Sequence, residues 1–373
     1  DSVDITAVTR DIFSLGAKLG GRTSAPEFSI YDANLAGRGQ RLEFSGVIDG
    51  SRNPTFGYGG YYRKRSVLGS LVNVEVGYTQ LNTGTSYGDE YEFAYFLFIN
   101  RPLVSPYSRL AGGAEISNNW SVNVYEEPDS TFLDYNYKVF DSWIGYNLGI
   151  KNVFANRNRY FIALRYLDGF FVDSPEQEEY QEDRDYNSIK GVLSEFTFYR
   201  KNYYKTRYVY GFGRTEDVPY GVTAAFTSGY LRELQLDRPY AAVKINYGQA
   251  SKRGNFYVLD FQTGGYLRNS ALEDLLVTAR ASYYTKALNV NRSKLRGVVS
   301  GGFSQLFSRT TDNYLNIRKS EVRGLSADTL NGTQRISAHV ETVLYTPRSI
   351  LGFRFAPFIG LDWASLDCIN CNE

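Results

Sequence analysis

The chain has 373 residues, of which 43% are hydrophobic and 16% aromatic, with one His, two Cys and no Met. Its 41 basic and 40 acidic residues leave a net charge of +1 and are spread along the chain, so there is no electrostatic case for nucleic-acid binding. A mean hydropathy of −0.36, without any run of about 18–20 apolar residues, argues against a helical membrane protein. The aromatic content suits a β-barrel, whose rings form girdles at both membrane interfaces.

Apolar and polar residues alternate along the whole chain with the period of two that is typical of β-strands. The pattern is clear in residues 13–20, 72–78, 335–341 and 353–363. Charged residues keep to one parity over stretches of about ten residues, the length with which a strand crosses a membrane. We therefore expect an all-β, transmembrane antiparallel barrel of 16 or more strands, with lipid outside and a polar lumen inside. A Lys or Arg facing lipid would cost about 2–4 kcal/mol at the bilayer centre.

The alternation predicts about seventeen strands in a single domain covering residues 1–373. Two long links, 171–189 and 308–334, stand among shorter ones, as in barrels. An odd count requires at least one further strand, so we expect C-terminal sequence beyond Glu373 to be missing. The approximate spans in chain order are 12–20, 39–48, 54–64, 70–80, 91–100, 108–122, 135–150, 158–170, 190–200, 203–213, 221–231, 238–248, 255–267, 273–286, 296–307, 335–346 and 351–364.

The segment 321–364 carries the most specific pattern. The tetrad Val322-Arg323-Gly324-Leu325 lies in the last long link, and the next strand carries Glu341. The following strand contains Gly360-x-Asp362-x-Ala364. Together these resemble the V-R-G-F/Y loop and the two strands after it in the BamA/TamA surface-antigen superfamily, which includes the FhaC-type translocators. Leu325 and Ala364 replace the aromatic residue and the glycine of the family patterns.

A second pattern near the start resembles the same family. Residues 31–40 read YDANLAGRGQ, similar to the D-x-N-L-x-G-x-G loop between the family's first two strands. The resemblance implies a sixteen-strand barrel in the outer membrane of a Gram-negative bacterium, with the motif loop before the twelfth strand. Our count places that loop before the sixteenth. The periplasmic POTRA modules of the family are not seen in this sequence.

The resemblance also implies a function. Barrels of this family insert proteins into the outer membrane or pass them across it, and the sequence leaves the two tasks open. Implied partners are outer-membrane lipids and lipopolysaccharide, client outer-membrane or secreted proteins, and lipoprotein accessory subunits; no nucleic acid, no metal and no cofactor are expected. The alternative is a passive, porin-like channel, which would have an open lumen without a plugging loop, or an accessory subunit of a larger complex.

A physical reason for the motif follows from parity, because His339, Glu341, Arg354 and Asp362 all point into the predicted lumen. A loop folded back inside could bring Arg323 to Asp362 or Glu341 and form a charge-assisted pair. We call this expected arrangement the loop lock, and in it Gly324 would permit close backbone approach. The alternative is a solvated loop arginine above ordinary lumenal acids. The residues of the expected lock are Val322, Arg323, Gly324, Leu325, Glu341 and Asp362.

The first strand is the second candidate site, because an unpaired edge can accept a further strand from a client protein. We expect a lateral seam there, weakened by Gly16 and Gly20; the alternative is that these glycines only relieve crowding in the lumen. The seam residues are Phe13, Leu15, Gly16, Ala17, Leu19 and Gly20.

Other candidate chemistry is weak, and no catalytic residue is expected. His339 is the single histidine and is expected to be lumenal filler rather than part of a triad. Cys368 and Cys371 lack the further ligands of a zinc site, so a loop disulfide, or part of a larger loop, is the simpler interpretation. Gly211-Phe212-Gly213 has no helix after it to cradle a phosphate. The acidic stretch 176–185 is expected to be a solvated outer loop.

Overall fold

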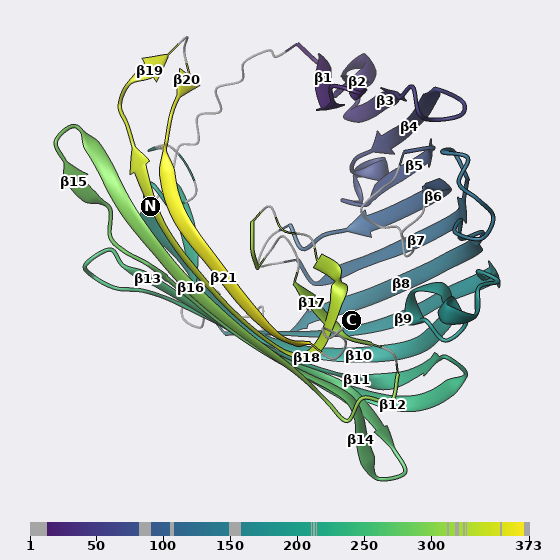
Figure 1. Cartoon of the computed structure of the whole chain (residues 1–373). Coiled ribbons are helices and arrows are strands. Elements are labelled where there is room, and N and C mark those ends of the chain that lie inside the picture. The colour runs from purple at the N-terminus through teal and green to yellow at the C-terminus, as the bar shows by residue number, and fades with distance from the viewer. Residues whose placement is uncertain are drawn as a thin grey trace. The chain divides into compact units, whose positions relative to one another are not determined.

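The computed structural model (Figure 1) describes residues 13–81, 91–104, 108–148, 158–209, 211, 213, 215–311, 313–317, 321–323, 325, 327–350 and 353–368. In this part of the chain nearly all regular structure is β, with seventeen strands of seven or more residues and a few short 3-10 turns. No helix in the described part is long and apolar enough to cross a membrane. The long strands are β1 (Leu15–Arg22), β2 (Ala25–Asp32), β3 (Gln40–Ile48), β4 (Phe56–Lys64), β5 (Asn73–Thr79), β6 (Glu92–Arg101), β7 (Leu110–Ser121), β8 (Asn136–Leu148), β9 (Arg159–Asp173), β10 (Ile189–Thr206), β11 (Glu216–Glu233), β12 (Leu236–Ala250), β13 (Phe256–Arg268), β14 (Ala271–Tyr284), β16 (Ser293–Phe307), β18 (Ala327–Tyr345) and β21 (Phe358–Cys368).

The strands form one 19-stranded sheet, which includes the short strands β15 (Leu288–Val290) and β17 (Leu315–Ile317). Each register that the structure gives is antiparallel and joins near neighbours in the chain, as in β1–β2, β11–β12 and β18–β21. A separate small hairpin contains β19 (Ser349–Ile350) and β20 (Phe353–Arg354). The all-β, antiparallel prediction is confirmed; the described residues show no pairing of β1 with β21 that would close the sheet.

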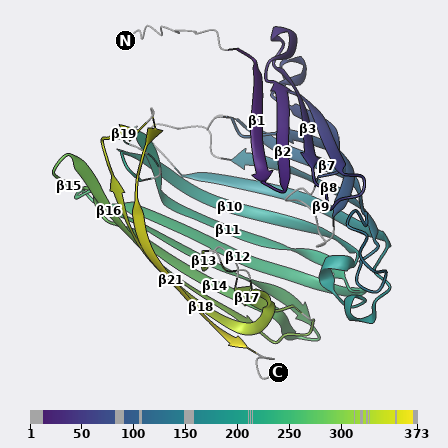
Figure 2. The ribbon, with the colours of Figure 1, turned by 45° about the horizontal axis from the view of Figure 1, so that its top comes forward.

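The chain divides into two compact units. Unit 1 comprises residues 1–103, 111–143 and 166–189, and unit 2 comprises residues 104–110, 144–165 and 190–373. Figure 2 shows the short strands β1–β3 of unit 1 side by side, and the long strands β10–β14 of unit 2 as a second set of neighbours.

The predicted number of strands matches the structure only because two errors cancel. Strand β2 was missed, because the predicted strands ran from 12–20 directly to 39–48. Conversely, the predicted strands 190–200 and 203–213 are largely one strand, β10, of 18 residues. The loop at residues 33–39 therefore lies between the second and third strands, and not between the first two.

Alternation sorts the side chains of each strand onto two faces, and the apolar face is the exposed one. On β21, Ile359, Leu361 and Trp363 are exposed, Leu361 at 72%. The polar face carries the buried charges instead, and Glu43 on β3 is only 8% exposed. Large exposed apolar faces are unusual in soluble proteins, and apolar-out, polar-in alternation is the pattern of a membrane barrel.

Aromatic side chains form a continuous row across unit 1. The rings of Phe56 and Tyr58 on β4 are stacked. The ring of Tyr58 also packs against that of Tyr78, with centroids 5.8 Å apart. The row continues through Tyr95, 4.7 Å from Tyr78, to Trp120, 5.5 Å from Tyr95. A row of aromatic rings of this kind is what a girdle at a membrane interface would contain.

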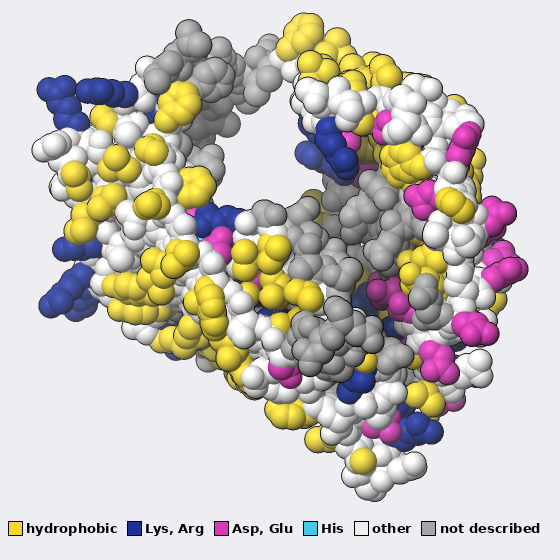
Figure 3. All heavy atoms as spheres, in the orientation of Figure 1, with side chains coloured by type: hydrophobic (Ala, Val, Ile, Leu, Met, Phe, Trp, Pro, Cys, Tyr) yellow, Lys and Arg dark blue, Asp and Glu magenta, His cyan; other side chains and the backbone are white. Residues whose placement is uncertain are grey.

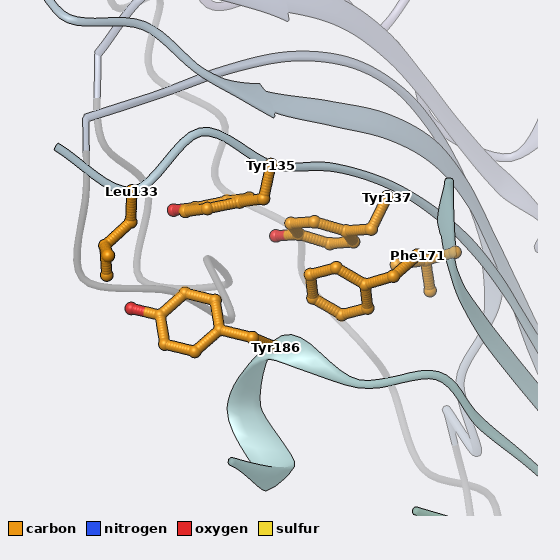
Figure 4. Packing of buried hydrophobic residues seen from close by; sticks show 6 residues of the cluster. Leu133, Tyr135, Tyr137, Phe171 and Tyr186 are labelled. Atoms are coloured by element: carbon orange, nitrogen blue, oxygen red, sulfur yellow. The ribbon is translucent and has the colours of Figure 1, made fainter. Parts of the chain in front are cut away.

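Within unit 1, a buried aromatic cluster packs the acidic link between β9 and β10 against residues 133–139 and Phe171 (Figure 4). Tyr186, in the short turn η5 (Arg184–Tyr186), is 2% exposed, and its ring lies 5.4 Å from that of Tyr135. Tyr135 and Tyr137 donate their hydroxyl groups to Glu92, at 3.0 and 2.8 Å. The expectation of a simple solvated loop over 176–185 is therefore incomplete, because buried tyrosines anchor this segment.

Candidate functional site

The candidate site lies on the polar face of β18 and β21 in unit 2. Antiparallel register pairs His339 with Asp362 and Glu341 with Gly360. Paired residues point to the same face of a sheet, and residues two apart along one strand do so as well. The sequence alternation therefore gathers one imidazole and two carboxylates, with a gap at the glycine.

Arg323 occupies that gap from the link before β18. Its Nε donates to Asp362 Oδ2 at 2.8 Å, its backbone N–H to the same oxygen at 3.2 Å, and its Nη1 to Glu341 Oε2 at 2.5 Å. Hydrogen bonds to Asp362, and then to Glu341, raise the pKa of Arg323 above its ordinary value, so the guanidinium stays charged. One planar cation thus bridges two strands and fixes the link to the sheet.

The space for the guanidinium comes from Gly360. A Cβ atom at this position would lie 2.3 Å from Nη2 of Arg323 and 3.2 Å from the carbonyl oxygen of Val340. Sequence reasoning assigned the role of permitting close approach to Gly324, which lies outside the described residues. Gly360 appeared only as part of a family pattern, and its opposition to Glu341 could not be known before the register.

Two more side chains complete the site. The Nδ1 of His339 is hydrogen-bonded to Asp362 Oδ1, and its Nε2 lies 3.9 Å from Glu341 Oε2. The ring of Phe358 lies 5.2 Å from the Arg323 guanidinium carbon, within cation–π range. His339 therefore orients the carboxylate that holds Arg323. Sequence reasoning treated this histidine as filler and did not consider Phe358.

Glu321 anchors the same link a second time. Its side chain is almost fully buried and forms ion pairs with Arg335 of β18 at 3.4 Å and Arg280 of β14 at 3.7 Å. Arg335 also donates to the carbonyl oxygen of Asn316 in β17, at 2.6 Å. Sequence reasoning missed Glu321, although parity already places Arg335 and Glu341 on one face of β18 and so indicates an acidic partner from the link.

Val322 and Leu325 lie on either side of Arg323 in the tetrad. The backbone N–H of Leu325 donates to the carbonyl oxygen of Val322 at 3.2 Å. Leu325 is exposed and Val322 is half-buried, so neither contributes a polar group to the lock. The structure thus brings Arg323, Glu341 and Asp362 together as the loop lock, with Val322 and Leu325 flanking the arginine.

The candidate seam strand, β1, is paired along its whole length with β2. Phe13, Leu15 and Leu19 are exposed large apolar residues, Leu19 at 89%, and Ala17 on the same face is exposed too. The two glycines differ. A Cβ at Gly16 would lie 2.4 Å from the ring of Tyr31, whereas a Cβ at Gly20 would meet nothing within 4 Å. Crowding therefore accounts for a glycine at position 16 but not at position 20.

The weaker candidates are largely beyond the described residues. Phe212 and Cys371 lie outside them, and Cys368 ends β21. Within the described part of the chain, no group of three or more His, Cys, Asp and Glu side chains could hold a metal ion.

No family model and no curated protein matches the chain. Among solved structures, it is similar to BamA from Haemophilus ducreyi lacking POTRA domains 1–3, at 10% identity and a TM-score of 0.41, over 94% of this chain and 75% of that one. It is also similar to CdiB from Acinetobacter baumannii, at 8% identity and a TM-score of 0.39, over 94% of this chain and 66% of that one.

Proposed function

We propose that this chain is an outer-membrane β-barrel of the BamA/TamA type, which inserts proteins into the membrane or translocates them across it. The observation that carries the proposal is the loop lock, in which Arg323 is bound to both Asp362 and Glu341. A passive channel is expected to have an open lumen without a plugging loop. Here the link before β18 is bound to the polar face of the sheet through both Arg323 and Glu321. The apolar side chains of the sheet are exposed and its charged side chains are buried, which supports a location in a membrane.

In this proposal β1 is the docking edge for client strands. Among the strand pairs whose register the structure gives, β1 pairs with β2 alone. A client strand adds to such an edge through main-chain hydrogen bonds, which are independent of client sequence. The exposed apolar face of β1 would share the lipid environment with the client's own apolar face. The partners of this activity are unfolded outer-membrane or secreted proteins, with lipoprotein subunits as accessories in the same membrane.

Single-channel conductance in planar bilayers tests the lock. We expect small, fluctuating conductance from the unaltered chain and large, steady conductance from Arg323→Ala, because the link is released. Arg232→Ala is the matched control, since Arg232 is an exposed arginine of the same unit with only a 4.0 Å contact to Asp237. Large, steady conductance already in the unaltered chain would overturn the proposal in favour of a passive channel.

A folding assay tests the activity itself. A urea-denatured eight-stranded outer-membrane barrel is diluted into vesicles with or without the reconstituted chain, and its folding is followed by the gel shift of unheated samples. We expect the chain to accelerate folding, and Arg323→Ala to lose the acceleration while Arg232→Ala keeps it. Equal client folding rates in empty vesicles and in vesicles with the chain would count against insertion.

A further inference from the structure

A cavity of about 550 Å³ lies at one end of unit 1. The links after β1, β3, β5 and β7 border it, since antiparallel pairing brings all four to this end. The volume falls within the range of about 300–1,000 Å³ that is typical of small-ligand sites. We call it the link cavity. Its side chains include Arg22, Glu27, Val47, Asp49, Tyr91 and Tyr125.

The floor of the link cavity lies on the polar face of the sheet. Val47 on β3 has the same parity as the buried Glu43, and it lies directly opposite Glu27 on β2. Glu27 in turn lies opposite Gly20 on β1, and Arg22 has the parity of Gly20. A Cβ atom at Gly20 would meet nothing within 4 Å, so the space beside Glu27 is open. The glycine that crowding did not explain thus leaves this space free.

A buried arginine lies beside this floor. Arg52 is 2% exposed, and its Cζ lies 2.8 Å from the place of a Cβ at Gly57, the residue opposite Val47. Its guanidinium also lies over the ring of Tyr91, 5.5 Å from the centroid. Nη1 donates to the carbonyl oxygen of Pro54 at 2.7 Å, whereas Nε and Nη2 have no hydrogen-bond partner in the part of the chain that the structure describes. A buried donor left without a partner costs about 1–3 kcal/mol, so a ligand oxygen that reaches Arg52 from the cavity would be stabilised.

The other charged groups of the link cavity are of two kinds. Arg22 and Glu27 form no hydrogen bond or ion pair with any described side chain, so both have their full hydrogen-bonding capacity. Asp49 is held in place, because it accepts from the hydroxyl group and the backbone N–H of Ser51, at 2.6 and 2.9 Å, and from the hydroxyl group of Tyr125 at 3.3 Å. The hydrogen bonds from Ser51 hold the pKa of Asp49 below its ordinary value, so this carboxylate stays ionised. The cavity thus offers free donors and acceptors on a wall that is already ordered, which lowers the cost of binding.

Charge balance selects a neutral ligand. Two cations, Arg22 and Arg52, face two carboxylates, Glu27 and Asp49, so the cavity has no net charge to attract an ion. An anion would also approach past acidic links, because residues 122–135 contain Asp and Glu but no Lys or Arg. Figure 3 shows Asp and Glu side chains along the right edge of the view, the side on which the link after β9 lies in Figure 1. A cation would meet the two arginines instead.

We propose that the link cavity binds a neutral carbohydrate. Each sugar hydroxyl group donates one hydrogen bond and accepts two, so neighbouring hydroxyl groups can accept from Arg22 and Arg52 while donating to Glu27. The C–H groups of the sugar ring can pack against Val47 and Tyr91, since a tyrosine offers an apolar ring beside its polar hydroxyl group. A charged phosphate lacks this apolar surface, and an acyl chain lacks the hydroxyl groups.

The position of the cavity indicates where the carbohydrate comes from. In unit 1 the links 80–91 and 122–135 leave at this end, and the shorter links 33–39, 65–72 and 102–109 leave at the other. The longer loops of outer-membrane barrels are extracellular, so the cavity opens to the outside and takes soluble glycans from there. Only this orientation rests on the proposed membrane barrel, and binding requires none of the proposed insertion activity.

An array of neutral hexose and N-acetylhexosamine oligosaccharides, probed with the labelled full chain in neutral detergent micelles, tests the site. We expect the chain to bind neutral glycans, and Arg22→Ala/Glu27→Ala to raise the apparent Kd for the best-bound glycan by about ten-fold or more, since two hydrogen bonds to charged groups are lost. The matched control is Arg38→Ala/Glu127→Ala, which removes two exposed charges of the same unit outside the cavity and should leave Kd unchanged. The same glycan in solution should displace the chain from the array.

Four results would overturn the proposal: no neutral glycan bound, equal Kd for the two double variants, displacement by the zwitterion alanylalanine as effective as by the glycan, or stronger displacement by lipopolysaccharide micelles, which would place the sugar in the membrane's own lipid. The measurement needs no client protein, so it can fail independently of the proposed function. An unaltered chain that binds glycans but does not accelerate client folding would contradict only the insertion activity. A chain that accelerates folding but binds no glycan would contradict only the carbohydrate site.

Discussion

At the residue scale, the loop lock depends on an absent side chain as much as on charged ones. Gly360 lies opposite Glu341, and the guanidinium of Arg323 fills the volume that a side chain would need. Because the guanidinium is the far end of a flexible side chain, it can move away, but it then leaves Asp362 and Glu341. A methyl group at this position therefore competes with two charge-assisted hydrogen bonds.

We predict that Gly360→Ala releases the loop as Arg323→Ala does. Limited trypsin digestion of the reconstituted chain should cut within residues 309–323 several-fold faster in both variants, because the link is no longer held on the sheet. Gly20→Ala is the control, since a Cβ there meets nothing within 4 Å. A Gly360→Ala protein that is cut at the same rate as the unaltered chain would show that the glycine is not needed by the lock.

Parity along single strands was enough to predict that Glu341 and Asp362 share one face, and the motif resemblance indicated Arg323 as their partner. It was not enough for Gly360 or Phe358, because their roles depend on which residue of one strand lies opposite which residue of the next. Cross-strand register is set by the whole sheet and its turns, so it cannot be predicted from the sequence of either strand alone.

At the scale of elements, a buried arginine ties two hairpins to the start of the loop that carries the lock. Arg238 is 0% exposed and lies 2.7 Å from Asp274, 3.1 Å from Glu273 and 3.7 Å from Glu233. Asp274 also accepts hydrogen bonds from the backbone N–H of Thr310, at 2.7 Å, and from its hydroxyl group, at 3.0 Å. The hairpins β11–β12 and β13–β14 thus share one cation with the start of the link after β16.

Removal of that cation should be costly. We predict that Arg238→Ala lowers the free energy of unfolding by about 3–5 kcal/mol, because it leaves buried carboxylates without their partner. Urea unfolding in vesicles, followed by tryptophan fluorescence, measures the change. Arg232→Ala, which loses only an exposed 4.0 Å contact, should change stability by less than about 1 kcal/mol. Similar losses in both variants would contradict the role of burial.

The acidic link between β9 and β10 offers a second test. Tyr186→Ala should free this link from the aromatic cluster, at a cost of about 3–5 kcal/mol for a buried aromatic ring. Hydrogen exchange of residues 174–188 should then become faster, while Glu178→Ala, an exposed change in the same link, should leave exchange as it is. Unchanged exchange in Tyr186→Ala would mean that the tyrosine does not hold the link.

Element boundaries followed from the sequence wherever alternation was unbroken. They failed at β2, for which no strand was predicted, and in the middle of β10, where two predicted strands are one. In both cases pairing with neighbouring strands outweighs local preference, since β-propensity depends on context.

At the scale of the whole molecule, the two faces of the sheet should respond oppositely to charge. Val340 lies on the exposed apolar face of β18, and Ser300, paired with His339, lies on the polar face of β16. We predict that Val340→Lys lowers the free energy of unfolding in vesicles, by about 2–4 kcal/mol for a position near mid-bilayer. Ser300→Lys should leave that free energy nearly unchanged. Urea titration of both variants in vesicles measures the difference. Equal tolerance of both lysines would contradict a lipid-facing apolar surface.

The lengths of the strands have a consequence for the lipid around them. Strands β1, β2 and β5 have 7–8 residues, while β10 has 18 and β18 has 19. A tilted strand needs about 9–11 residues to cross the hydrocarbon core. In a bilayer, lipids beside β1, β2 and β5 therefore have to shorten or disorder their acyl chains to match a smaller hydrophobic thickness, at a cost of fractions of a kcal/mol per Å. Lipids beside β10 and β18 face no such deficit, so strands of the two units call for different membrane thicknesses.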